Sequence, residues 1–361
     1  MNYPPDRKRS RYMEWAKLSS GARFNLATSG LTNVLMAEFP LSLGELEITG
    51  GGYGYELLLE RIAQHTGAPL ECIVTADGTS LANHLALASL LEPGDEVVIE
   101  QPGYGPLVDL ARYLGAQVRR IERRCADNFG ISLGEMERAI TPATRLVVLT
   151  NLHNPSGVLL PRETLQALGA LAQRVGARVL VDEVYLEMLA APDSAFSLGE
   201  TFLVTSSLTK AYGLSGLRCG WIIAPAELAH RIRRLHDLFA ATRAYPAERM
   251  SVVAFDHLAQ FRERARTLLA TNRPILDAFL DSRADLECVR PHAGTVVFPR
   301  LPQGDPDIFL TLLREKYETS VVPGAFFEAP RHFRLGIGAE TSNVHAGLER
   351  LGAALDEFAS R

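Results

Sequence analysis

The stretch TFLVTSSLTKAYGLSGLRCGWIIA, residues 201–224, joins two apolar runs through a polar, glycine-rich segment. Within that segment Lys210 lies shortly after Ser207 and one short loop before Arg218. An amine among apolar and cationic neighbours has a lowered pKa, which favours the nucleophilic free base. A serine hydroxyl and the fork of an arginine can together hold a phosphate. The segment therefore favours a reactive lysine beside an anion-binding site over a surface lysine beside a helix cap.

Apolar runs like these two alternate with amphipathic stretches from about residue 72 to residue 224. Most are rich in Val, Ile and Leu, which is typical of strands covered on both faces. The clearest helix is expected over Pro161–Val175, where leucines recur at helical spacing and Gly176 follows. This order predicts an α/β fold of three layers, α/β/α, with a mainly parallel seven-stranded sheet. The expected strands are Cys72–Ala76, Glu96–Glu100, Gln117–Ile121, Leu146–Thr150, Arg178–Val181, Thr201–Thr205 and Cys219–Ala224.

After Pro225 the pattern changes to longer helices and then to a shorter mixed stretch. We expect residues 45–235 to form a large domain, and residues 1–44 and 236–361 to form a smaller α+β domain built from both chain ends. The expected elements of this part are helices through Leu228–Phe239 and Arg262–Leu280 and strands over Thr295–Phe298 and Ser320–Val322.

Composition restricts the class of function. The chain has 361 residues, of which 47% are apolar and 22% charged, and its net charge is -5, so a nucleic-acid partner is not expected. The basic cluster at residues 7–11 is interpreted as a solvated arm. No apolar run reaches the length of a membrane span and no signal-peptide core is visible, so we expect a cytoplasmic protein without a membrane partner. The four cysteines lack metal-ligand spacing, so no metal site is expected.

Polar residues follow several expected strands, at the sheet edge where ligands of such folds bind. Gly78, Thr79 and Ser80 follow the first strand and open a helix, which gives either a phosphate cradle or a plain helix cap. Tyr104 follows the second strand. Its ring could lie flat over a planar ligand or pack within a turn.

Two further strand ends carry an amide and a carboxylate. Asn154 precedes a proline, so its backbone is held in a turn. Its side-chain amide could close an Asx turn or donate a hydrogen bond to a phenolic oxygen. Asp182 ends a buried apolar run, where an unpaired carboxylate is costly. It needs a cation, which could be a protonated pyridine nitrogen or a nearby Arg or Lys.

In series these motifs resemble the class I/II aminotransferases, enzymes of fold type I that depend on pyridoxal 5'-phosphate (PLP). Residues 207–220 resemble the lysine motif of that family, and Asn154-Pro155-Ser156-Gly157 resembles its Asn-Pro-Thr-Gly turn. Residues 182–185 resemble its Asp-x-x-Tyr element. VVPGAFF at 321–327 and FRLGIG at 333–338 resemble its C-terminal block. The resemblance extends from about Gly30 to Gly338 in the order of the family.

The resemblance implies an aminotransferase that moves an amino group between an L-amino acid and a 2-oxo acid, with PLP as its cofactor. Lys210 would form the Schiff base and carry the α-proton, and Asp182 would keep the pyridine nitrogen protonated. Tyr185 and Asn154 would bond the phenolic oxygen, and Tyr104 would stack on the ring. The implied phosphate ligands are Gly78, Thr79, Ser80, Ser207 and Arg218. Arg334 would take the substrate α-carboxylate, beside the backbone of Gly30.

The resemblance also implies a homodimer with shared active sites, and here the sequence departs from the family. Thr49 stands where the family often has a tyrosine that reaches the phosphate of the neighbouring subunit. Tyr53 or Tyr55 could replace it. No second arginine for a distal carboxylate can be placed, which argues against dicarboxylic substrates.

Other readings stay open at this point. The same motifs would serve β-elimination, decarboxylation or cyclisation of an amino acid, since a fold does not fix the reaction. A non-catalytic regulator is disfavoured, because the forty or so residues before the fold leave no room for a DNA-binding module.

Overall fold

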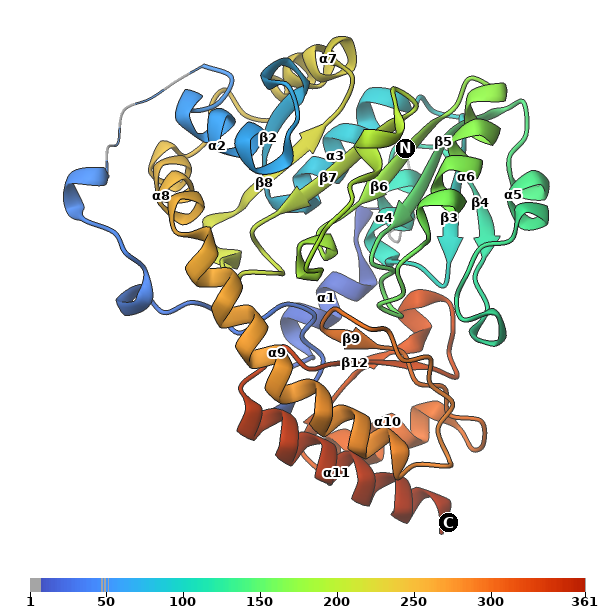
Figure 1. Ribbon diagram of the computed structural model, residues 1–361. Coiled ribbons are helices and arrows are strands. Elements are labelled where there is room, and N and C mark those ends of the chain that lie inside the picture. The colour runs from blue at the N-terminus through green and yellow to red at the C-terminus, as the bar shows by residue number, and fades with distance from the viewer. Residues whose placement is uncertain (1–7, 47, 49, 51, 361) are drawn as a thin grey trace.

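The computed structural model describes residues 8–46, 48, 50 and 52–360, and its centre is one seven-stranded sheet (Figure 1). The strand order is β2-β8-β7-β6-β5-β3-β4. Strand β8 runs antiparallel to β2 and β7, and all other neighbours are parallel. The strands are β2 (Ile73–Asp77), β3 (Glu96–Gln101), β4 (Gln117–Glu122), β5 (Thr144–Thr150), β6 (Arg178–Asp182), β7 (Phe202–Ser207) and β8 (Cys219–Ile223). The expected mainly parallel sheet is confirmed.

Helices cover both faces of this sheet, which explains its almost unbroken apolar strands. Along β5, Val147 and Leu149 pack into one core while Leu146 and Val148 pack into the other, as the twofold repeat of a strand requires. The helices on the first face are α2 (Glu56–Thr66), α5 (Leu133–Ala139), α6 (Arg162–Arg174) and α8 (Tyr245–Asp256). Those on the second are α3 (Gly78–Leu90), α4 (Gly105–Tyr113) and α7 (Ala226–His236). This is the expected arrangement of three layers.

A smaller α+β part lies against the edge of the sheet where the parallel strands end (Figure 1). It joins both ends of the chain: β1 (Phe24–Asn25) pairs in parallel with β10 (Thr319–Ser320). The strand expected over Ser320–Val322 is split, because β11 (Val322–Pro323) belongs to another sheet, of order β11-β12-β9. The remaining elements are α1 (Arg11–Leu18), β9 (Val296–Val297), α9 (Leu258–Asp281), α10 (Pro306–Glu315), β12 (Phe333–Gly336) and α11 (Thr341–Ala359).

A separate core fills this second part. Leu26 from the N-terminal segment packs there with residues of α9, α10 and α11. Helix α8, by contrast, buries Val252 and Val253 in the core on the first face of the large sheet. The division into residues 45–235 and the two chain ends stays a prediction.

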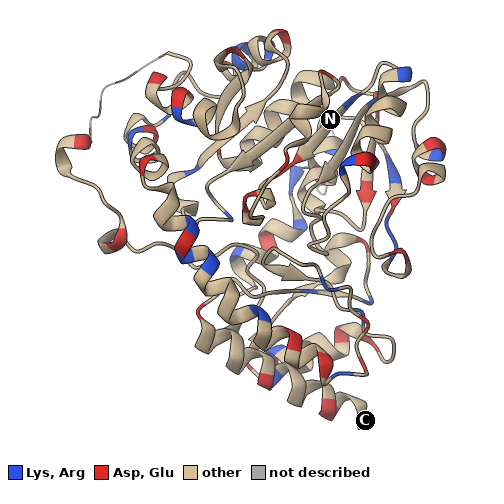
Figure 2. Ribbon diagram, in the orientation of Figure 1, with Lys and Arg blue, Asp and Glu red and all other residues tan. Residues whose placement is uncertain are grey.

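Charged residues of both signs are interspersed along the helices (Figure 2). In the described part of the chain, no helix combines the length and apolar character that crossing a membrane requires. Within the same residues, no group of three or more His, Cys, Asp or Glu side chains is placed to hold a metal ion. All four cysteines are free thiols.

Candidate active site

A cavity of about 960 Å³ lies where the parallel strands of the large sheet end and the smaller part begins. Ten of the twelve residues that the sequence singled out line it: Gly30, Thr79, Ser80, Tyr104, Asn154, Asp182, Tyr185, Lys210, Arg218 and Arg334. The other two, Gly78 and Ser207, contact residues that line the cavity. Gly78 lies against Arg218, and Ser207 accepts a hydrogen bond from Thr79. The sheet edge thus gathers residues that are far apart in the sequence.

Lys210 follows β7 in the loop that leads to β8. Its backbone oxygen accepts a hydrogen bond from the Leu31 amide at 3.0 Å, which ties it to the N-terminal segment. A Cβ on Gly30 would lie 3.2 Å from Lys210 Cδ, so Gly30 leaves room for the lysine side chain. Burial, together with the positive charges of Arg334 and Arg218, lowers the pKa of Lys210 to about 8, although Asp182 opposes the shift. The neutral fraction of the amine near pH 7 is therefore a minority, but it is far larger than that of an ordinary lysine.

The turn from β2 into α3 approaches the loop after β7 very closely. Gly78 has a φ of +73°, and a Cβ there would lie 2.2 Å from Arg218 Nη2. The Gly78 amide donates to the Arg218 carbonyl at 2.7 Å, and Thr79 Oγ1 donates to Ser207 Oγ at 2.8 Å. A guanidinium, two hydroxyls and the open amides of a helix N-terminus therefore converge, which is the chemistry of an anion site.

Asp182 ends β6 at the bottom of the cavity. Its carboxylate accepts from Asn83 Nδ2 at 2.8 Å and from the Val184 amide at 3.1 Å. Both donors are neutral, and burial raises the pKa of Asp182 to about 6. A cation placed in the cavity beside this carboxylate would lower that pKa again and stabilise the charge.

Arg334 of β12 is 1% exposed and enters the site from the smaller part. Its Nη1 donates to Asn154 Oδ1 at 2.9 Å, and its Nη2 donates to Tyr12 Oη and to the Ala27 carbonyl, both at 3.0 Å. The Asn154 amide oxygen thus meets a cation, rather than closing only a local Asx turn. Nε of Arg334 has no hydrogen-bond partner among the described residues.

Two tyrosines complete the walls of the cavity. The ring of Tyr104 contacts that of Tyr12 edge to face, with centroids 5.6 Å apart. Burial raises the pKa of Tyr185 to about 12, so its phenol is a hydrogen-bond donor at physiological pH. Tyr104 and Tyr185 lie where the sequence placed them, at the ends of β3 and β6.

Sequence reasoning missed Tyr12 and Asn83. Asn83 stands four residues after Thr79 on α3, so helical spacing alone puts both on one face. Tyr12 in α1 gave no comparable signal, because its partner Arg334 is 322 residues away.

The described residues of the glycine-rich stretch, 50 and 52–55, are not among those that line this cavity. Thr49 falls outside the described residues. Tyr53 donates from its hydroxyl to Asp237 at 2.9 Å, and Tyr55 packs edge to face on Tyr245. In this subunit, neither Tyr53 nor Tyr55 is among the residues that line the cavity.

Known proteins of similar sequence identify the family of this chain. The family model for aminotransferase class I and II matches residues 14–351. Capreomycidine synthase of Streptomyces vinaceus is 29% identical over 94% of this chain and 91% of its own length. An arginine–pyruvate transaminase of Pseudomonas aeruginosa is 29% identical over 80% of this chain and 77% of its own.

Solved structures agree with the family match. The crystal structure of a PLP-dependent aminotransferase from Streptococcus suis superposes with a TM-score of 0.90 at 27% identity, and covers 99% of both chains. The likeness spans both the large sheet and the smaller part. The chain therefore belongs to the class I and II aminotransferases, a family of pyridoxal-phosphate-dependent transferases.

Proposed function

We propose that this protein binds PLP through Lys210 and transfers an amino group from an L-amino acid to a 2-oxo acid. The observation that carries the proposal is the position of the Lys210 amine. Lys210 lines the cavity together with Arg218 of the anion site, the buried Asp182 carboxylate and Arg334, and the charges of all three act on its amine. The lowered pKa of Lys210 supplies the neutral amine that covalent attachment of an aldehyde needs.

The described residues fit the cofactor at both ends. Gly78, Thr79, Ser80, Ser207 and Arg218 would hold the phosphate, and an added Cβ at Gly78 would fill that cradle. Thr209 Oγ1 is a buried hydroxyl of the same wall without a partner among the described residues. At the other end, the Asp182 carboxylate would bond the protonated ring nitrogen and so gain the cation that its burial demands.

Residues between these two ends would orient the ring and the substrate. Tyr185 and Asn154 would donate to the phenolic oxygen, and Tyr104 would cover one face of the ring. Bound PLP supplies an electron sink for the substrate α-carbon. Lys210 would then accept and return the α-proton at its amine, and Arg334 would hold the α-carboxylate beside Gly30.

A second candidate is cyclisation or another reaction of an amino acid on the same site. The specific observation for it is the relative from Streptomyces vinaceus, which is named as a synthase and aligns with 94% of this chain. The need for an oxo acid as second substrate distinguishes transamination from these other reactions. A transaminase mixed with the donor alone stops after one half-reaction, whereas a lyase or cyclase turns over without an oxo acid.

We further propose a homodimer with shared active sites and a cytoplasmic location. Support for the dimer comes from residues 35–46, 48 and 50, which project from the body (Figure 1) and expose large apolar side chains at Leu35, Met36, Leu43 and Ile48. Such a segment would be covered by a second copy, and would place Tyr53 or its neighbours near the partner's phosphate site. The free cysteines fit a reducing compartment.

The direct test is borohydride trapping. Protein loaded with PLP should show a visible absorption band, and reduction should attach the cofactor to the peptide that contains Lys210, as read by mass spectrometry. Lys210→Ala should lose both signals. Lys17→Ala is the matched control because Lys17 is a second lysine of the same cavity, and it should keep both. Trapping at full stoichiometry in Lys210→Ala would refute the assignment. A screen of amino donors, followed by loss of the band, would then identify the substrate.

A further inference from the structure

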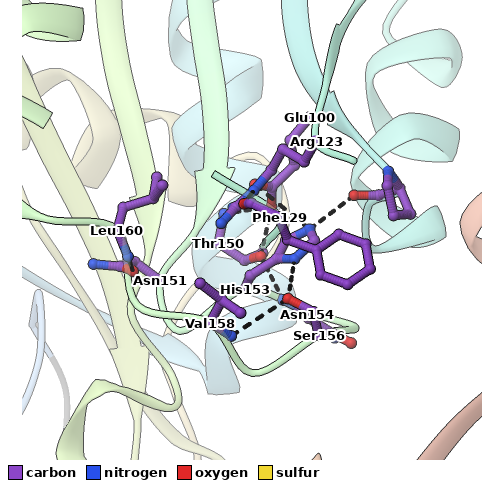
Figure 3. A network of polar contacts seen from close by, with 11 residues as sticks. Glu100, Arg123, Phe129, Thr150, Asn151, His153, Asn154, Ser156, Val158 and Leu160 are labelled. Atoms are coloured by element: carbon purple, nitrogen blue, oxygen red, sulfur yellow. Dashed lines mark hydrogen bonds and ion pairs between the residues drawn. The ribbon is translucent and has the colours of Figure 1, made fainter. Parts of the chain in front are cut away.

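A fully buried ion pair lies directly behind the Asn154 turn (Figure 3). Glu100 is near the end of β3 and Arg123 follows β4; Arg123 Nη1 lies 2.6 Å from Glu100 Oε2, and the two side chains are 0% and 1% exposed. Arg123 Nε also donates to the Phe129 carbonyl at 2.5 Å. A buried ion pair is weak evidence for stability, since well-packed apolar residues often serve as well. The pair is therefore better understood from the groups that it holds in place.

The pair begins a chain of hydrogen bonds that ends in the active site. Glu100 Oε1 accepts from the Thr150 amide at 2.7 Å and from the Thr150 hydroxyl at 2.5 Å. Because that hydroxyl gives its single proton to Glu100, it presents a lone pair to the backbone N–H of Asn154, which donates to it at 2.8 Å. Asn154 Oδ1 in turn accepts from Arg334. The direction of each bond in the chain is fixed, because backbone N–H groups and the Arg334 guanidinium can only donate.

A second branch ties the neighbouring turn to the same place. His153 Nε2 lies 2.8 Å from the Pro102 carbonyl, which can only accept, so this nitrogen carries the proton. Its Nδ1 then accepts from Ser156 Oγ at 2.6 Å. Pro102 is two residues before Tyr104, so the turns that carry Tyr104 and Asn154 are joined by one buried network.

We propose that Glu100 and Thr150 are positioning residues of the active site. They hold the turn at residues 150–154 so that the Asn154 side chain keeps its oxygen on Arg334 and its amide group toward the cofactor's phenolic oxygen. This inference rests on the proposed function. Without the Thr150 hydroxyl, the backbone N–H of Asn154 loses its acceptor and the turn relaxes. The side-chain amide group of Asn154, the donor to the phenolic oxygen, then moves away.

The same two strands contain a matched control at their opposite ends. Thr144 at the start of β5 is fully buried, and its hydroxyl donates to Oε1 of Glu96 at 2.6 Å, at the start of β3. A Thr–Glu pair of the same chemistry thus occurs far from the site. Replacing either threonine by valine keeps the shape and removes one buried hydroxyl.

The experiment compares Thr150→Val with Thr144→Val in PLP-loaded protein. The readout is the pH midpoint of the visible band, which reports the hydrogen bonds to the ionised chromophore. Loss of a donor to the ionised form raises the midpoint, so Thr150→Val should raise it by roughly half a unit or more. Thr144→Val should leave the midpoint unchanged. Its melting temperature should fall by about as much as that of Thr150→Val, since each variant loses one buried hydroxyl. Thr150→Ser should restore the wild-type midpoint. An unchanged midpoint in Thr150→Val, or an equal rise in both valine variants, would overturn the proposal.

A double variant keeps the test decisive if Thr150→Val does not fold. Glu100→Leu combined with Arg123→Met replaces both charges at once, so neither charge is left buried alone, and its melting temperature should fall less than that of either single variant. The midpoint should still rise, because Thr150 has lost its acceptor. A wild-type midpoint in this variant would refute the role of Glu100. Wild-type protein that fails to trap PLP on Lys210 would instead refute the proposed function, which separates the two failures.

Discussion

At the scale of single residues, the proposed role of Lys210 as a reactive amine depends on where the side chain is buried. Burial is the largest effect on its pKa, and the charge of Arg334 adds to it. Arg334 is itself held by Asn154 from the large-sheet part and by Tyr12 from the N-terminal segment. A lysine with the same sequence neighbours on an open surface would keep its ordinary pKa.

This predicts the pH dependence of cofactor attachment. Apoprotein mixed briefly with PLP and reduced with borohydride should trap more cofactor as pH rises, with a midpoint near the pKa of about 8 for Lys210. The rise reflects the neutral amine, which replaces the ammonium above that pKa. Arg334→Gln removes a positive charge that disfavours the ammonium, so the midpoint should move upward. A midpoint near the ordinary lysine value in wild-type protein would contradict this account.

At the scale of elements, the phosphate end depends on how closely α3 begins beside the loop that precedes β8. Gly78 and Gly220 both allow that approach, since a Cβ on Gly220 would lie 2.5 Å from the Gly78 carbonyl carbon. The first turn of α3 thereby lies under the Arg218 guanidinium. Strand pairing of β2 with β8 sets this register, and the last residue pair in it is Asp77 with Cys219.

Alanine variants of two glycines distinguish the effect of backbone strain on stability from damage to the proposed phosphate site. Gly78 and Gly67 have nearly the same positive φ, +73° and +72°, but only a Cβ at Gly78 meets Arg218. Each alanine variant should lose about 1–2 kcal/mol of unfolding free energy, because a Cβ is strained in the left-handed region. Only Gly78→Ala should also weaken PLP binding, by tenfold or more, as measured by equilibrium titration. Equal PLP affinity in the two variants would show that the cradle tolerates a side chain.

At the scale of the whole molecule, the site lies between two separately packed parts. The sheet supplies Lys210, Asp182 and Asn154, and the smaller part supplies Arg334. The N-terminal segment crosses between them, with Tyr12 in the cavity and Leu26 in the second core. The projecting residues 35–46, 48 and 50 expose several large apolar side chains, although Phe39 among them packs into the core on the first face of the sheet.

The proposed dimer gives a prediction at this scale. Leu43 is 87% exposed on the projecting segment, whereas Leu133 is 57% exposed on α5, at the far edge of the sheet. Leu43→Asp should lower the molar mass measured by light scattering at micromolar concentration, because a charge would be buried at the interface. Leu133→Asp should leave the mass at that of wild type. A wild-type protein that is monomeric throughout would rule out the shared site.

Much of this protein can be predicted from its sequence, because strands buried on both faces must be apolar throughout. All seven expected runs form the central sheet, and polar residues after them mark the cavity edge. The separation of Ser320 and Val322 into different sheets was not predictable, since each pairs with a strand remote in sequence.

The tertiary structure alone decided the contacts between those residues. Local patterns show which side chains follow a strand, but partners such as Arg334 and Tyr12 are brought together only by packing across the whole chain. The role of Glu100 was hidden for the same reason. Its strand reads as one apolar run, and its charge acquires a meaning only beside Arg123 and Thr150. The sequence by itself determined the layers and predicted the reactive lysine, whereas long-range packing determined the contacts that hold the layers and the lysine in place.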